Sequence, residues 1–153
     1  MRRRDKEIID RALIDIILEA AVVCRIALCE DDRPYIVPMN FAYWDGYLFL
    51  HSAGEGKKID ILKKNQNLCF EVDTECEPVP ADKPCDWSMK YYSVIGFGRA
   101  VLVEGIEEKK KGLDVIVEKY SGKPYTHYTE EMLDRLVVIK VEIENITGKM
   151  SKG

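Results

Sequence analysis

The spacing of apolar residues along the chain predicts an order of helices and strands. Apolar side chains recur three and four positions apart over residues 6–20, at Ile9, Leu13, Ile16, Ile17 and Ala20, which is typical of one face of an amphipathic helix. Similar spacing predicts helices over residues 55–65, 106–120 and 129–135. Runs of β-branched, aromatic and other apolar residues predict strands over residues 22–29, 34–43, 47–51, 68–73, 91–104 and 136–146.

Turn residues between the first three strands predict a meander. The segment Glu30–Arg33 is polar, and Asp45-Gly46 is a dipeptide that tight hairpin turns favour. Pro38 cannot donate a ladder hydrogen bond, so the second strand needs an edge, a bulge or a ligand-facing stretch at this point.

Two later segments depart from simple strand patterns. Residues 74–90 contain three prolines and many polar residues, which predicts a long loop of the functional or disordered kind. In the strand over residues 91–104, Gly96 and Gly98 predict a bend or a close approach of the backbone to another group.

These elements predict the fold class. Six antiparallel strands with peripheral helices indicate a mainly β, α+β protein, and a small barrel fits better than a doubly wound sheet because regular crossover helices are missing. The 153 residues predict one domain, 1–153, long enough to bury a core of its own.

Charge and cysteine usage exclude several classes of function. The 23 basic and 27 acidic residues are mostly interspersed, which argues against a nucleic-acid surface. Charged residues interrupt the apolar stretch near the N-terminus, so we expect no signal peptide, no membrane segment and a cytoplasmic protein. Five cysteines without a C-x-x-C pair, beside two histidines, fit neither a disulfide framework nor a zinc site. We expect Cys24 and Cys69 to be small buried residues, while a reactive or pairing role stays open for Cys76 and Cys85.

The segment from His51 to Lys58 contains the most informative chemistry. A strand ends and a helix begins here through Ser52, Gly54 and Gly56, so free backbone N–H groups, a hydroxyl and two lysines can face an anion such as a phosphate monoester. A simple turn with solvated lysines explains the same residues. The spacing matches neither a Walker A loop nor a Rossmann glycine pattern, so a different phosphate-bearing ligand is required.

Three segments together carry a family resemblance. They are Pro34-Tyr35-Ile36-Val37-Pro38-Met39-Asn40-Phe41-Ala42-Tyr43, Leu50-His51-Ser52-Ala53 through Gly56-Lys57-Lys58, and Cys85-Asp86-Trp87 with Tyr92-Ser93-Val94-Ile95-Gly96-Phe97-Gly98-Arg99-Ala100. In this order and spacing the chain resembles the 5-nitroimidazole resistance branch of the pyridoxamine-phosphate-oxidase-like flavoproteins.

The resemblance implies an FMN-binding split barrel that forms a homodimer, with one flavin in each of two clefts between the subunits. It assigns the phosphate to Ser52, Lys57 and Lys58, the strand along the isoalloxazine to Val37, Pro38, Met39 and Asn40, and a bordering strand to Tyr92 and Ser93. Residues 144–150 lack the arginine- and histidine-bearing motif of pyridoxamine-phosphate oxidase itself, so oxidation of that substrate is not expected.

The resemblance also places His51 near a substrate, where it could donate a proton, although a histidine at a strand end often serves only as a hydrogen-bonding residue. His127 is expected at the surface.

The implied activity is an FMN-dependent reductase. A reduced nicotinamide or another donor loads the flavin, which reduces a small planar acceptor such as a nitro compound. Two alternatives remain: a flavin-binding carrier, sensor or store without strong turnover, and a haem-binding barrel with His51 as an axial ligand.

Overall fold

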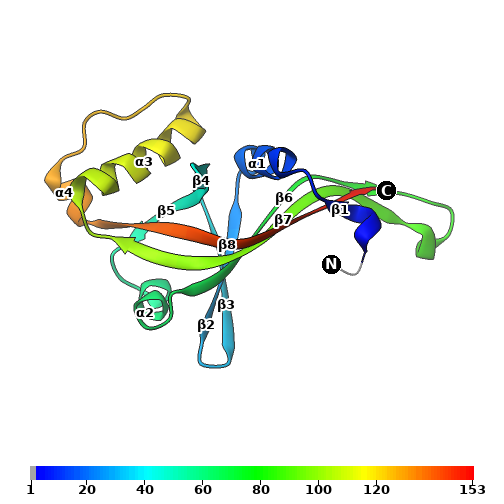
Figure 1. Ribbon diagram of the computed structural model, residues 1–153, viewed down its shortest axis with the longest axis horizontal. Helices are drawn as coiled ribbons and strands as arrows, with labels where there is room; N and C mark the ends of the chain where they lie inside the picture. Colours follow the sequence, from blue (N-terminus) through cyan, green and yellow to red (C-terminus); the bar gives the residue numbers. More distant parts are fainter. Residues whose placement is uncertain (1–2) are drawn as a thin grey trace.

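The computed structural model describes residues 3–153; Met1 and Arg2, at the start of the predicted domain, lie outside the described residues. A curved antiparallel sheet forms the body, and helices lie along its margins (Figure 1). The strands are β1 (Glu7–Ile8), β2 (Cys24–Glu30), β3 (Arg33–Met39), β4 (Phe41–Trp44), β5 (Tyr47–Ala53), β6 (Asn67–Val79), β7 (Ser88–Val103) and β8 (Leu136–Lys152). The α-helices are α1 (Arg11–Ala20), α2 (Lys57–Lys64), α3 (Ile106–Ser121) and α4 (Glu130–Asp134).

The order of the strands shows a split barrel. It runs β3-β2-β6-β7-β8-β5-β4, and β1 pairs with β8. The two end strands, β3 and β4, are joined in sequence by Asn40 alone, so the sheet curves until its ends meet at this residue. Within residues 3–153, no ladder of hydrogen bonds joins β3 to β4. The sheet is therefore not closed, as expected for a split-barrel fold.

The predicted meander of three strands is wrong at this point. The hairpins β2–β3 and β4–β5 form as expected, and Asp45 and Gly46 make the second turn with positive φ angles of 52° and 81°. The predicted strand over residues 34–43 divides at Asn40, because the part before it pairs with β2 and the part after it pairs with β5, at the other end of the strand order. Pro38 lies on β3, which is an edge strand of the sheet, so the missing N–H of Pro38 interrupts no hydrogen bonds to a further strand.

The first helix is shorter than predicted. The side chain of Asp10 accepts a hydrogen bond from the Ala12 N–H, so α1 begins at Arg11 and Ile9 precedes it. Ile9 and Ile16 are exposed, and the buried face consists of Ile14, Ile17 and Leu18. The helices predicted over residues 55–65, 106–120 and 129–135 form with small changes at their ends.

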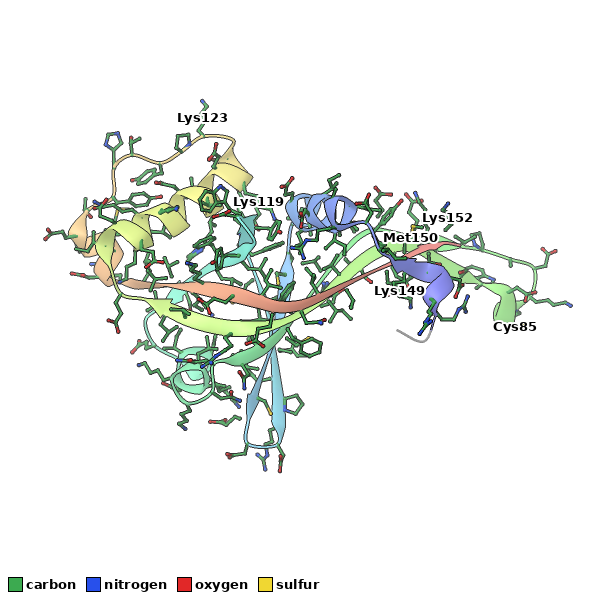
Figure 2. The ribbon with its side chains drawn as sticks, in the orientation of Figure 1. Cys85, Lys119, Lys123, Lys149, Met150 and Lys152 are labelled. Carbon is green, nitrogen blue, oxygen red and sulfur yellow. The ribbon has the colours of Figure 1, made fainter. Side chains whose placement is uncertain are left out.

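The long loop predicted over residues 74–90 is also wrong. β6 continues to Val79, β7 begins at Ser88, and the two strands form a hairpin that projects from the body (Figure 1). The sequence hides these strand ends, because the hairpin is polar on both faces and its register shifts between Thr74 and Glu77. Cys85 lies at its tip (Figure 2), in a single 3₁₀ turn over Pro84–Asp86. β8 extends past the predicted end at residue 146 and pairs with this hairpin as far as Lys152.

The core lies on the concave side of the sheet, and glycines let its layers approach closely. A Cβ atom at Gly96 would lie 2.3 Å from the Phe70 ring, and one at Gly98 would lie 2.3 Å from the backbone oxygen of Glu142. A register shift separates Phe97 from Gly98, so the predicted bend and close approach are both present. A second, smaller cluster on the outer face packs Phe49 and Val138 beneath α3.

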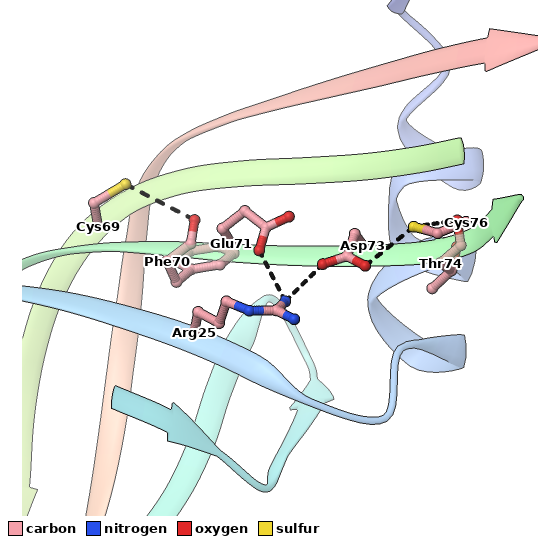
Figure 3. Close-up of polar contacts among 7 residues, drawn as sticks. All are labelled: Arg25, Cys69, Phe70, Glu71, Asp73, Thr74 and Cys76. Carbon is pink, nitrogen blue, oxygen red and sulfur yellow. Dashed lines mark hydrogen bonds and ion pairs between the residues drawn. The ribbon is translucent and has the colours of Figure 1, made fainter. Parts of the chain in front are cut away.

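The cysteines are free thiols in varied surroundings. Cys24 is fully buried, which raises the pKa of its thiol to about 12, and Cys69 is half-buried. Cys76 and Cys85 are exposed, and the Cys76 thiol donates a hydrogen bond to the Asp73 carboxylate (Figure 3). Over residues 3–153, none of the helices combines the length and the apolar character that crossing a bilayer requires.

Candidate functional site

The start of α2 presents a set of hydrogen-bond donors. β5 ends at Ala53, and the chain enters the helix through Gly56, whose φ of 107° and ψ of 166° suit a residue without a Cβ atom. No side chain caps this N-terminus. The N–H of Ile59 already donates to the Gly56 oxygen, so the backbone N–H groups of Lys57 and Lys58 remain available to an anion, and the helix dipole favours negative charge here.

His51 and Lys58 form a basic pair beside this helix start. Burial lowers the pKa of His51 from its ordinary value, and the charge on Lys58 lowers it further. Burial also lowers the pKa of Lys58, whose side chain is half-buried. Two basic groups that are partly desolvated, and that repel each other when both are charged, gain stabilisation from an anion placed near them.

Lys57 points to a different part of the structure. Its Nζ lies 3.7 Å from a carboxylate oxygen of Glu30 on β2 and 5.0 Å from the centroid of the Tyr35 ring on β3. Lys64, in the last turn of α2, lies 3.8 Å from the other Glu30 oxygen. Lys57 therefore points toward the β2–β3 hairpin, while the charge of Lys58 acts on His51 of β5.

The strand assigned to the isoalloxazine leads into this region. Along β3, Val37 and Met39 share the inner side with Tyr35, while Pro38 faces outward and is exposed. Asn40 is exposed at the break between β3 and β4. Phe41 pairs with Leu50 at the open end of the β4–β5 hairpin. Asn40 comes just before Phe41 and His51 just after Leu50, so these two residues lie beside each other at this end. The structure thus brings residues 37–40 and 51–58 to one side of the split.

Tyr92 and Ser93 lie far from His51 and the start of α2 in the folded chain. His51 pairs with Val138, and Val138 pairs with Val103 on β7. Ser93 lies ten residues before Val103 on the same strand, a path of about 33 Å at the usual strand rise. Figure 1 shows the same separation, with α2 and the C-terminus toward opposite ends of the sheet. One chain alone does not bring all the sequence-predicted site residues together.

Ser93 borders an open hollow on the outer face of the sheet. Together with Ile95, Thr147 and Lys149 it encloses a volume of about 300 Å³. Beside this hollow, Arg25 Nη1 lies 3.2 Å from Glu71 and 2.6 Å from Asp73 (Figure 3). Burial raises the pKa of Glu71, and the neighbouring Asp73 carboxylate raises it further, against the opposing effect of Arg25. The outer face therefore carries two acidic residues, Glu71 and Asp73, and two basic residues, Arg25 and Lys149, next to its apolar residues.

A row of apolar side chains, exposed at its two ends, crosses the same outer face. Ile36 on β3 pairs with Ala27, Ala27 with Cys69, and Cys69 with Phe97 on β7. The exposed fractions are 64% for Ile36 and 54% for Phe97, which is high for side chains of this size. Ile95, beside this row, is also exposed.

Sequence reasoning missed several residues that the structure brings to the predicted ones. Glu30 and Tyr35 contact Lys57, Lys149 and Thr147 lie beside Ser93, and Tyr120 bonds to the backbone of Phe41. These contacts join parts of the chain that are far apart in sequence, so no local pattern indicates them. His127 is exposed as expected, next to Tyr125.

Comparison with known proteins identifies the family. Residues 10–150 match the family model described as pyridoxamine 5'-phosphate oxidase. The chain belongs to this family. The resemblance stated from the sequence is thereby confirmed. A protein of Bacteroides thetaiotaomicron VPI-5482, provisionally described as a 5-nitroimidazole antibiotic resistance protein, has a solved structure with a TM-score of 0.84 to this chain. The two are 33% identical over 94% of this chain and 85% of that one.

Two further members of the fold are more distant in sequence. A FAD and haem binding protein of Mycobacterium smegmatis has a TM-score of 0.87 at 20% identity, covering 97% of this chain and 74% of that one. A flavocytochrome of Azotobacter vinelandii has a TM-score of 0.85 at 19% identity, covering 100% and 72%. An uncharacterized protein of Rhizobium meliloti (strain 1021) is 34% identical over 56 residues, which are 37% of this chain and 36% of that protein.

Proposed function

We propose that this member of the family is an FMN-binding flavoprotein that reduces small planar acceptors such as nitro compounds. The observation that carries the proposal is the uncapped start of α2, beside the basic side chains of His51 and Lys58, whose pKa values are both lowered by partial burial. This is where the family resemblance assigns the flavin phosphate. The nitroimidazole-resistance description of the Bacteroides protein and the flavin-binding names of the other two relatives support the same cofactor class.

The donors at this helix start fit a phosphate monoester. The Ser52 hydroxyl, the Lys57 and Lys58 ammonium groups and the first N–H groups of α2 would hold the phosphate. On β3 the outward-facing, exposed Pro38 would border the ring system, Val37 and Met39 would support it from the core beneath, and Asn40 would supply polar contacts at its edge. Bound FMN supplies hydride or electron transfer to the acceptor.

His51 is the candidate proton donor to the reduced acceptor. Its lowered pKa leaves the ring neutral around pH 7, so the imidazolium form increases only as the solution becomes more acidic. We therefore expect turnover with a nitro compound to rise as the pH falls toward the His51 pKa. His51→Ala should lower this turnover and flatten its pH dependence. Unchanged turnover and unchanged FMN affinity in this variant would remove the proposed role.

The site is proposed to form between two copies of the chain. The path of about 33 Å along β7 from the His51 end of the sheet to Ser93 is longer than one FMN molecule. Two copies that face each other across the outer surface would place Tyr92 and Ser93 of one near the α2 start of the other. The large exposed side chains of Ile36 and Phe97, at the two ends of the apolar row, support such an association, because burying them between copies would be favourable.

Mixing two variants that each bind FMN weakly tests this arrangement, at an FMN concentration that fills only intact sites. Lys57→Ala/Lys58→Ala removes one half of the proposed site, and Ser93→Asp places a negative charge at the other half. After denaturation and refolding together in equal amounts, about a quarter of the sites should be intact and should bind FMN. Each variant refolded alone is the control. Recovery of no FMN binding in the mixture, with both variants folded, would contradict a site shared between copies.

Turnover separates a reductase from a flavin-binding carrier or sensor. The protein is loaded with FMN, reduced without oxygen, and mixed with a nitroimidazole or with dissolved oxygen in a stopped-flow instrument. A reductase should be re-oxidised faster by the nitro compound than by oxygen at equal concentrations. Slower re-oxidation by the nitro compound would favour the carrier or sensor.

Haem is the second candidate ligand, since the names of two relatives of the same fold include haem or a cytochrome. His51 is the candidate axial ligand because much of its side chain is exposed beside the split. A Soret band in the purified protein that is lost in His51→Ala would show that the protein binds haem through His51. Absence of a Soret band would exclude this second candidate.

A further inference from the structure

The last turn of α3 contacts the split in the sheet through Tyr120. The Tyr120 hydroxyl accepts a hydrogen bond from the Phe41 N–H at 3.0 Å and lies 3.2 Å from the Phe41 backbone oxygen. It also donates to the backbone oxygen of Val22, just before β2, at 2.7 Å. One side chain thus contacts the first residue of β4 and the segment that leads into β2.

These contacts replace a missing strand. The N–H and the C=O of Phe41 both reach Tyr120, so both point away from β5 toward the open edge of the sheet. In a closed barrel a neighbouring strand would satisfy them, but β3 and β4 share no ladder within residues 3–153. A phenol hydroxyl has one donor and two acceptor sites, so it can accept from the N–H and give its proton to the nearer Val22 oxygen.

The adjacent Lys119 contacts the same residue from its other side. Its Nζ lies 3.6 Å from the centroid of the fully buried Phe41 ring and donates to the backbone oxygen of Leu18 at 3.3 Å. Figure 2 shows Lys119 at the end of α3 that lies next to β4 and α1. The backbone and the ring of Phe41 are therefore both held by the same helix turn.

We infer that Tyr120 is a positioning residue for the ligand site at Asn40. Asn40 directly precedes Phe41 and lies at the same hairpin end as His51, so the hydroxyl of Tyr120 fixes the point from which the ligand-facing backbone departs. The inference rests on the proposed function, because it gives Asn40 a role only if the ligand lies along residues 37–40. Tyr120 itself contacts the backbone and acts through it.

Tyr120→Phe tests the inference, with Tyr43→Phe as the matched control. Tyr43 lies two residues further along β4, and its hydroxyl also has two polar partners, Arg11 at 2.9 Å and Asp15 at 2.8 Å. Tyr120→Phe should raise the FMN dissociation constant about tenfold and alter the visible circular dichroism of bound FMN. Tyr43→Phe should leave the affinity within about twofold and the visible spectrum unchanged.

Hydrogen exchange on the protein without ligand gives a second readout. The amide of Phe41 should exchange faster in Tyr120→Phe than in the wild type, whereas Tyr43→Phe should leave it protected. Wild-type FMN affinity, spectrum and exchange in Tyr120→Phe would overturn the inference. So would equal weakening of FMN binding by both variants, since this indicates a general loss of stability. Failure of the wild-type protein to bind FMN overturns the proposed function first, and the inference with it.

Discussion

Glu30 and Lys57 form an ion pair of 3.7 Å between β2 and the first residue of α2. The same carboxylate also faces Lys64 at the end of α2, so one acidic side chain partly neutralises a lysine at each end of the helix. A phosphate bound there competes with Glu30 for Lys57. The ion pair is exposed, so its own contribution to stability is small.

Glu30→Gln should therefore strengthen FMN binding. Removing the competing carboxylate leaves Lys57 available to the phosphate, and we expect the dissociation constant to fall about threefold. Titration of the apoprotein with FMN, followed by quenching of flavin fluorescence, measures the change. Glu77→Gln is the control, because Glu77 pairs with Lys90 on the distant hairpin. Weaker FMN binding in Glu30→Gln would show that Lys57 does not face the phosphate.

Lys57→Ala/Lys58→Ala should weaken FMN binding by tenfold or more. Each lysine is expected to contribute roughly 1.5–3 kcal/mol of charge-assisted contact before other groups compensate. Lys63→Ala, in the last turn of the same helix, serves as the control for a change in helix charge. If the double variant binds FMN as tightly as the wild type, the anion site lies elsewhere.

His51 should report anion binding through its pKa. Burial and the Lys58 charge lower the His51 pKa in the folded protein, so a nearby phosphate should raise it, and Lys58→Met should raise it as well. Titration of the His51 imidazole signal by NMR, with and without inorganic phosphate, measures both effects, and the exposed His127 supplies an internal reference signal. A His51 pKa that does not respond to phosphate or to Lys58→Met would contradict the basic pair.

Lys119 should make stability depend on pH in the alkaline range. Burial lowers the pKa of its ammonium group from 10.5 to about 8, so between these values the unfolded chain binds more protons than the folded protein. The contribution of Lys119 to the free energy of unfolding should therefore increase as pH rises from about 8 to about 10.5.

Urea unfolding of the wild type and Lys119→Met at both ends of this range measures the difference. We expect the wild type to gain on the order of 1 kcal/mol relative to the variant, because solvent screens this half-exposed group. A constant difference between the two proteins across the range would contradict the lowered pKa.

Local patterns predicted much of the fold. The apolar spacing located α2, α3 and α4, and Asp45-Gly46 located the β4–β5 turn, because these features depend on neighbours in sequence. The break at Asn40 was missed because the segment around it is β-forming on both sides, and only the curvature of the whole sheet separates β3 from β4. The ends of β6 and β7 were missed because charged residues occupy them, such as Glu75 and Lys90, which form an ion pair. Apolar residues therefore do not alternate along these parts of the two strands.

The candidate site was predictable only in parts. The glycines and lysines at residues 54–58 indicated an anion site from chain-local chemistry, and the structure places an uncapped helix start there. Family resemblance was needed to connect this segment with residues 37–40. The roles of Glu30 and Tyr120 depend on contacts across the fold, and the distance to Ser93 depends on strand register, so neither follows from a single sequence.

The visible absorption spectrum of the protein purified without added cofactor decides whether this chain is a flavoprotein. We expect the two bands of an oxidised flavin, release of FMN on denaturation, and rebinding of FMN to the apoprotein. A colourless protein that also fails to bind added FMN would contradict this expectation.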